Sequence, residues 1–189
     1  MTRKVWSRAF FSLALLVTLA TFAASAQSQS SGAPNRVDIN PRLVTSGQPS
    51  AEALAGLAAQ GFEAVIYLAP PTVADAVRDE ALIVGRQGLL FVNIPIKFDN
   101  PTEKDFEAFT SVLSALSARK VLVHCQINLR ASSMVFLHRV ISRKEDPGVA
   151  YEAVAKVWSP DGPWKNSDPN AIAQERCELR ALLSNSLEI

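Results

Sequence analysis

Apolar and polar positions along the chain follow two patterns in turn, which predict strands and helices that alternate. Short apolar runs rich in Val, Ile and Leu predict strands at about residues 42–47, 62–68, 89–94 and 121–124. Stretches with helical spacing of apolar residues predict helices at about 51–60, 73–87 and 102–116. Strands that alternate with helices indicate an α/β domain with a mainly parallel sheet flanked by helices.

Two further patterns complete this scheme. Thr102 followed by Asp105 has the spacing of a capping box, which predicts the start of a helix. Apolar residues beyond position 130 predict a helix directly after the fourth strand, and further helices are expected at 148–157 and from about 170. In a parallel sheet, ligands bind at the carboxyl ends of the strands, from which three loops leave, at 46–49, 97–101 and 125–130. We expect the first of these loops to be a plain turn between a strand and a helix.

Composition and charge narrow the picture. The chain has 189 residues, of which 48% are hydrophobic and 20% are charged, so a single domain with a substantial core is expected. The formal net charge of +1 and the absence of a basic run give no reason to propose nucleic acid as a partner.

The N-terminal segment has the features of an export signal. Arg3, Lys4 and Arg8 precede an apolar run, and Ala24-Ser25-Ala26 fits the small-residue pattern of a cleavage site. We expect residues 1–26 to be a signal peptide, 27–35 a flexible lead-in and 36–189 the folded domain. An uncleaved membrane anchor is the alternative, but the run is short for a spanning helix and contains hydroxyl residues. The expected location is periplasmic or secreted, with no stable membrane span after cleavage.

The strand at 121–124 leads into the residues with the clearest chemistry. Cys125 follows this strand, and Arg130 lies where the next helix is expected to begin. The first amides of such a helix and the positive end of its dipole form an anion site, which also favours a thiolate. An arginine there can bind two oxygens of an oxyanion. The arrangement predicts a thiolate that attacks a bound tetrahedral anion.

His124-Cys125 followed closely by Arg130 resembles the signature of cysteine-dependent phosphatases of the tyrosine and dual-specificity type. The most similar group is a bacterial phosphatase-like subfamily that also occurs fused to metallo-β-lactamase-like hydrolases. The resemblance extends from about Arg36 to about Trp164. It implies a dual-specificity-phosphatase-like fold, a phosphoenzyme on Cys125, an oxyanion held by Arg130 and the loop amides, and indirect support of the thiolate by His124.

The loop itself departs from the pattern of that family. Only four residues separate Cys125 from Arg130, where the family has five; they are Gln126, Ile127, Asn128 and Leu129. The loop has no glycine, so Asn128 is the candidate for a position with positive φ. Counted from Cys125, Ser132 falls at the position of the family's hydroxyl, which assists the thiolate. A gap of four residues also resembles the active loop of rhodanese-type sulfurtransferases.

The resemblance also implies a general acid upstream of the nucleophile. Asp99 lies 26 residues before Cys125, on the loop before the preceding helix, and would protonate the leaving group. Its alternative role is to cap the turn at Asn100-Pro101. No metal or organic cofactor is expected, because the loop amides and Arg130 supply the electrostatic stabilisation. Cys177, the other cysteine, is expected to be a partly buried helix residue.

These patterns together predict an exported phosphatase that hydrolyses phosphomonoesters through a phosphocysteine. Its partner would be a phosphorylated small molecule or a phosphoprotein such as one carrying phosphotyrosine. Two alternatives stay open. One is a rhodanese-like sulfurtransferase that carries a persulfide on Cys125, and the other is a catalytically weak domain that binds an oxyanion.

Overall fold

The computed structural model describes residues 32–167. Its strands are β1 (Val37–Asn40), β2 (Leu43–Ser46), β3 (Ala64–Tyr67), β4 (Leu90–Asn93) and β5 (Val121–His124). Its α-helices are α1 (Ala51–Ala55), α2 (Glu80–Gly85), α3 (Glu103–Ala115), α4 (Leu129–Leu137) and α5 (Pro147–Ala155). Shorter helical segments are η1 (Ala58–Gln60), η2 (His138–Ser142) and η3 (Gly162–Ser167). The expected signal peptide, the helix from about residue 170 and Cys177 lie outside the described residues.

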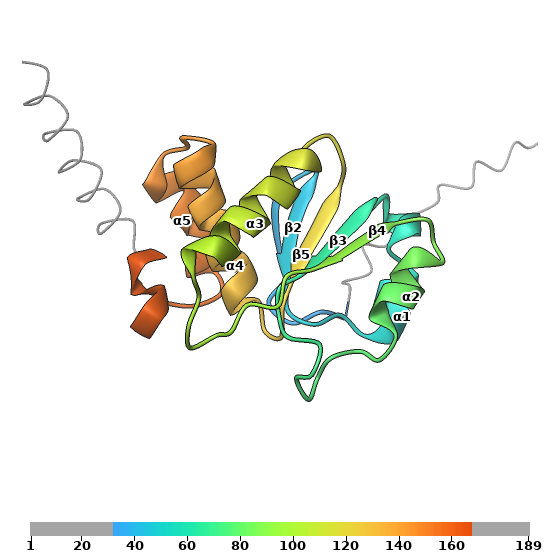
Figure 1. Cartoon of the computed structure of the whole chain (residues 1–189). Helices are drawn as coiled ribbons and strands as arrows, with labels where there is room; N and C mark the ends of the chain where they lie inside the picture. Colours follow the sequence, from blue (N-terminus) through green and yellow to red (C-terminus); the bar gives the residue numbers. More distant parts are fainter. Residues whose placement is uncertain (1–31, 168–189) are drawn as a thin grey trace, which may run out of the picture.

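The five strands form one sheet in the order β1-β2-β5-β3-β4 (Figure 1). β1 is antiparallel to β2, and all other neighbours are parallel, so the predicted mainly parallel sheet is confirmed. β5 lies at the centre, and its last residue, His124, pairs with Ser46 of β2 and with Tyr67 of β3. The loops that follow these strands therefore leave the sheet at the same edge.

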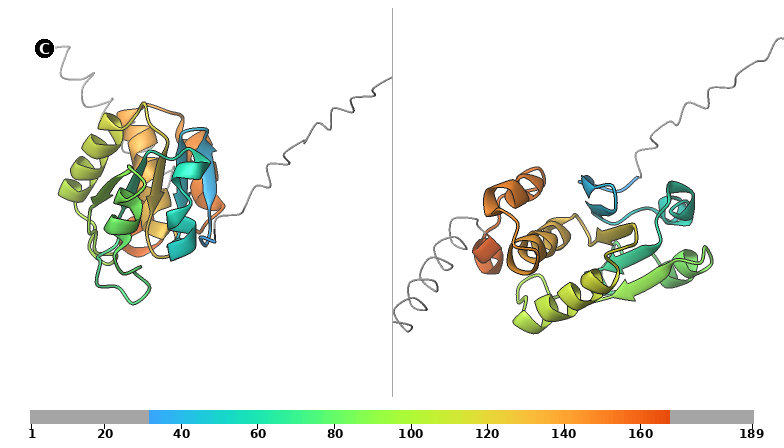
Figure 2. Two further views of the ribbon diagram at one scale, coloured as in Figure 1. Left: turned by 90° about the vertical axis from the view of Figure 1, so that its right-hand side faces the viewer. Right: turned by 90° about the horizontal axis from the view of Figure 1, so that it is seen from above.

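Helices cover both faces of the sheet (Figures 1 and 2). Alternate residues of a strand point to opposite faces. Accordingly Val65 and Leu122 pack with residues of α1 and α2. Ile66 and Val123 pack on the other face with residues of α3 and α4. Both faces of the central strand are thus buried, as its continuous apolar sequence predicts.

Several element boundaries follow directly from local sequence. The capping box between Thr102 and Asp105 is present, because each of these residues accepts a hydrogen bond from the backbone N–H of the other. The helix expected at 51–60 is divided into α1 and η1, with Gly56 at the end of α1. After Leu137, helix α4 continues as the π-helical segment η2.

The helix expected at 73–87 is wrong for most of its length. Residues 71–79 form turns, and α2 begins only at Glu80. Asp79 has a left-handed backbone with φ 61°, so a helix cannot run through it. Val73 and Val77 pack against two separate apolar clusters, so their helix-like spacing does not mark one face of a helix. Strand β1 was not expected from the sequence.

Within residues 32–167, no helix combines the length and the apolar character needed to cross a bilayer.

Candidate active site

Cys125 lies directly after the central strand and is only 1% exposed. Its backbone N–H donates to the Ser46 carbonyl oxygen at 3.3 Å, and the His124 carbonyl oxygen accepts from the Leu68 N–H at 2.8 Å. The strand end is therefore held from both sides by the residues that end β2 and follow β3. Helix α4 begins four residues later, at Leu129. Cys125 is thus fixed at the carboxyl edge of the sheet, beside the first turn of a helix.

Asn128 gives the loop its shape. Its φ is 73°, which confirms the prediction that this residue takes the left-handed conformation in a loop without glycine. Its side chain is fully buried, and its Nδ2 donates to the Asn35 carbonyl oxygen at 2.5 Å and to Thr45 Oγ1 at 3.1 Å. Asn128 therefore anchors the loop from behind rather than facing a ligand.

The segment after β2 braces the same loop. The Gln48 N–H donates to the Gln126 carbonyl oxygen at 2.8 Å, and Gly47 forms a β-bridge with Ile127. A Cβ at Gly47 would lie 2.8 Å from the Gln126 carbonyl oxygen and 3.0 Å from Ile127 Cα. Only glycine permits this approach, so the loop at 46–49 is more than the plain turn that the sequence suggested.

A pocket of about 240 Å³ opens over the loop. It is lined by Asp75, Phe98, Cys125, Gln126, Ile127, Leu129 and Arg130. The structure therefore brings together most of the residues predicted for the anion-binding loop. Asn128 is the exception, because it points away from this pocket.

Arg130 is a largely buried cation in this pocket. It is 6% exposed, and within residues 32–167 no carboxylate forms an ion pair with it. Its guanidinium carbon lies 5.2 Å from the centroid of the Phe98 ring, a distance at which a cation is attracted to an aromatic face. The Phe98 carbonyl oxygen accepts from Trp164 Nε1 at 2.8 Å, which fixes the loop that supplies this ring. Arg130 Nε is buried and has no hydrogen-bond partner in the described part of the chain.

The two carboxylates near the pocket differ in position. Asp99, the predicted general acid, is exposed and does not line the pocket, so its role stays a prediction. Asp75 does line the pocket, and its Oδ1 accepts from Gln126 Nε2 at 2.8 Å. Sequence reasoning did not identify Asp75 as a site residue, because the apolar spacing predicted a helix there. Its place after Pro70-Pro71, on the loop at the carboxyl end of β3, was the available signal.

Ser132 is buried on α4, where its Oγ donates to the Leu129 carbonyl oxygen at 3.1 Å. Among residues 32–167, neither Ser132 nor any other residue forms a hydrogen bond with Cys125 Sγ. The neighbouring Ser133 is fully buried, and its Oγ is without a partner in the same part of the chain. A role of Ser132 in assisting the thiolate remains a prediction.

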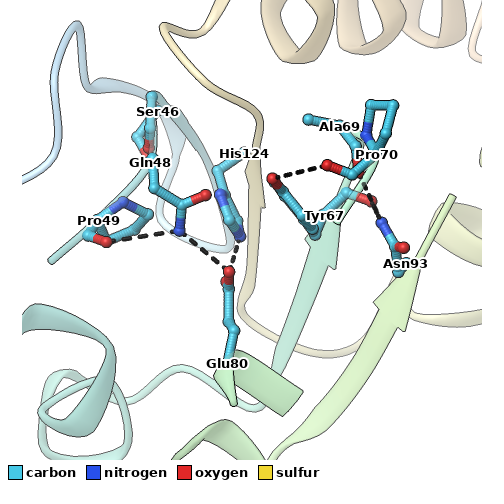
Figure 3. A network of polar contacts seen from close by, with 10 residues as sticks. Ser46, Gln48, Pro49, Tyr67, Ala69, Pro70, Glu80, Asn93 and His124 are labelled. Atoms are coloured by element: carbon cyan, nitrogen blue, oxygen red, sulfur yellow. Dashed lines mark hydrogen bonds and ion pairs between the residues drawn. The ribbon is translucent and has the colours of Figure 1, made fainter. Parts of the chain in front are cut away.

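A buried polar network surrounds His124, the residue before Cys125 in the chain (Figure 3). His124 Nε2 lies 2.7 Å from Glu80 Oε1, and Glu80 Oε2 accepts from Gln48 Nε2 at 3.0 Å. The Tyr67 ring stacks on His124 with centroids 4.7 Å apart. Burial, the Glu80 charge and the Asp75 charge raise the pKa of Tyr67 to about 12. His124 thus faces Glu80 rather than the pocket. No sequence pattern had pointed to Glu80.

Within the described residues, no group of three or more His, Cys, Asp or Glu side chains is placed to hold a metal ion.

Comparisons with known proteins agree with this geometry. A family model described as a DSP-PTPase phosphatase fused to NAD+ kinase matches residues 15–171. A "Beta-lactamase hydrolase-like protein" of Xylella fastidiosa is 34% identical over 109 residues, which are 56% of this chain and 25% of that protein. The chain therefore spans about a quarter of the length of that curated relative.

Solved structures show the same fold. A phosphatase-like DUF442 protein from Shewanella putrefaciens CN-32 is 29% identical, with a TM-score of 0.66 over 76% of this chain and 94% of that one. Tk-PTP in its active form shares the fold at 20% identity, with a TM-score of 0.58 over 73% of this chain and 96% of that one. The chain belongs to the DSP-PTPase family and is a member of the cysteine-dependent phosphatase superfamily.

Proposed function

We propose that this protein is an exported phosphatase that hydrolyses phosphomonoesters through a phosphocysteine on Cys125. The observation that carries the proposal is Arg130, a cation that is 6% exposed, shares a pocket with Cys125 and has no carboxylate partner within residues 32–167. A buried charge without a counter-charge is costly. A phosphoryl dianion would supply that counter-charge beside the cysteine.

The chemistry follows from these positions. The Cys125 thiolate attacks the phosphorus atom, so that an S–P bond forms while the P–O bond to the leaving group breaks. Arg130 and the amides at the start of α4 stabilise the charge on the other phosphoryl oxygens. A carboxylic acid gives its proton to the leaving oxygen. Water then attacks the phosphocysteine, the carboxylate accepts a proton from that water, and phosphate and the thiolate are released.

The apolar lining of the pocket supports an aromatic phosphomonoester as substrate. Phe98 and Ile127 line the pocket, and Ile127 is 50% exposed although it is a large apolar residue. An aryl ring beside these side chains would remove apolar surface from water. We therefore place aryl phosphates, including phosphotyrosine, first among the substrate classes. The N-terminal charge pattern, apolar run and Ala24-Ser25-Ala26 support periplasmic or secreted localisation.

One observation favours a second candidate. Four residues, not five, separate Cys125 from Arg130, and this gap resembles the loop of rhodanese-type sulfurtransferases. A shorter loop offers one amide fewer to a phosphoryl group, whereas a persulfide sulfur on Cys125 needs less room. A weak oxyanion-binding domain is the remaining alternative.

One preparation separates these functions. Wild-type protein and Cys125→Ser are each given an aryl phosphate and, separately, thiosulfate with a cyanide acceptor. The proposal predicts phosphate release that depends on Cys125 and no thiocyanate. Cys125-dependent thiocyanate without phosphate release would establish the sulfurtransferase. If neither product forms, the oxyanion-binding domain is the remaining interpretation.

A further inference from the structure

The Gln126 side chain lies between a carboxylate and the buried arginine. Its Nε2 donates to Asp75 Oδ1 at 2.8 Å. Its Oε1 accepts from both terminal nitrogens of Arg130, each at 3.4 Å. All three residues line the pocket that contains Cys125. One carboxamide thus connects Asp75 to Arg130 across the site.

Gln126 Oε1 lies against the two terminal nitrogens of Arg130, which are the donors available to an oxyanion. The two terminal nitrogens of an arginine form a fork that suits two oxygens of a carboxylate or phosphoryl group. The two contacts to the oxygen of this neutral amide are long, at 3.4 Å each. Hydrogen bonds from a guanidinium to an anionic oxygen are typically about 2.7–2.9 Å. A phosphoryl group that used both nitrogens would therefore displace the amide from Arg130. Because the same amide also binds Asp75, that hydrogen bond is disturbed as well.

We propose that Asp75 is the proton donor to the leaving group, and that Gln126 holds it until a phosphoryl group takes over Arg130. This inference rests on the proposed function, whose acid it names. Asp75 stands on the loop that leaves the carboxyl end of β3, and it lines the same pocket as Cys125. Asp99 is exposed outside that pocket, although its neighbour Phe98 reaches in.

The proton balance is simple. The first step begins with a bound phosphoryl dianion and Asp75 as the neutral carboxylic acid. The Asp75 carboxyl gives its proton to the leaving oxygen as the P–O bond breaks, and it becomes a carboxylate. In the second step it accepts a proton from the attacking water, which restores the acid and releases phosphate.

Two matched substitutions test which aspartate acts. Asp75→Asn and Asp99→Asn are compared on aryl phosphates with a basic and with an activated leaving group. We expect Asp75→Asn to lower kcat for the basic leaving group by about a hundredfold or more, to affect the activated one much less, and to flatten the alkaline limb of the pH profile. Retained turnover of the activated ester shows that this variant is folded.

Each other outcome has a distinct meaning. If the selective loss occurs in Asp99→Asn instead, or if Asp75→Asn slows both esters equally, the inference is overturned while the phosphatase remains. If wild-type protein releases no Cys125-dependent phosphate, the proposed function fails and the inference fails with it.

A second pair of variants tests the displacement. Gln126→Ala removes the competing amide. We expect the inhibition constant of inorganic phosphate to be about threefold to tenfold lower for this variant than for wild type, which corresponds to the free energy of one ordinary hydrogen bond. Gln126→Glu places a carboxylate on Arg130 and is expected to weaken that inhibition. Weaker inhibition of Gln126→Ala by phosphate would show that the amide helps to bind the anion, and would overturn the holding role.

Discussion

His124 Nε2 and Glu80 Oε1 lie 2.7 Å apart, and the two side chains are 0% and 5% exposed. The pair joins the first residue of α2 to the last residue of β5, immediately before Cys125. Gln48, from the segment that braces the anion-binding loop, donates to the other oxygen of Glu80. The carboxylate therefore ties three separate chain segments together behind the cysteine.

Removing the Glu80 carboxylate should destabilise the folded protein. We expect Glu80→Ala to lower the free energy of unfolding by about 1–3 kcal/mol, because it leaves His124 and Gln48 buried without their partner. Glu80→Gln keeps the shape and an acceptor oxygen and should cost less. Denaturant unfolding measures both. Glu107→Ala, at an exposed site on α3, is the control and should stay within about 0.5 kcal/mol. Equal losses in Glu80→Ala and Glu107→Ala would contradict the network.

Gly47 tests the close approach beneath the loop. Gly47→Ala should destabilise the protein by about 1–3 kcal/mol, because its Cβ would overlap backbone atoms of residues 126 and 127. It should also slow Cys125-dependent turnover, since the loop must shift. Gly85→Ala is the matched control, because a Cβ there meets no atom within 4 Å. An unchanged melting temperature in Gly47→Ala would refute this contact.

Asn128 separates backbone shape from hydrogen bonding. Asn128→Gly retains the left-handed backbone but loses the two hydrogen bonds of Nδ2. Asn128→Ala loses the same two hydrogen bonds and also disfavours the left-handed backbone. It should therefore be less stable than Asn128→Gly by about 1–2 kcal/mol. Thermal unfolding of the two variants beside wild type gives this difference. Alanine proving as stable as glycine would mean that the positive φ is not required.

His138 predicts a pH dependence. Burial and the nearby Arg143 charge lower its pKa from the usual 6.5, against the opposing Glu145 charge. The unfolded chain therefore binds a proton at this site more readily than the folded protein does. Stability should fall as the pH is lowered below about 6.5, until the pH passes the folded pKa. His138→Gln should lessen that fall in urea unfolding between pH 7.5 and about pH 5. If the free energy of unfolding falls equally with pH in His138→Gln and in wild type, this contribution of His138 is contradicted.

Local pattern was sufficient wherever the chemistry is carried by neighbours in sequence. The strand before Cys125, the helix after it and the left-handed Asn128 all follow from adjacent residue types. Helical spacing of apolar residues hid Asp75 despite the preceding Pro70-Pro71, and no local pattern pointed to Glu80. Both depend on the turns at 71–79, where Val73 and Val77 pack by tertiary contact rather than along one helix face. The partners of Glu80 lie far away in sequence, at positions 48 and 124.

The covalent state of Cys125 during turnover is the most direct test of the account. Wild-type protein is mixed with an excess of an activated aryl phosphate and stopped by a denaturing quench within the first turnover, and its peptides are examined by mass spectrometry. We predict one phosphoryl group on the peptide that contains Cys125. This group should be absent when the quench is delayed until all of the substrate has been consumed. Phosphate release with no adduct on Cys125 would contradict the account.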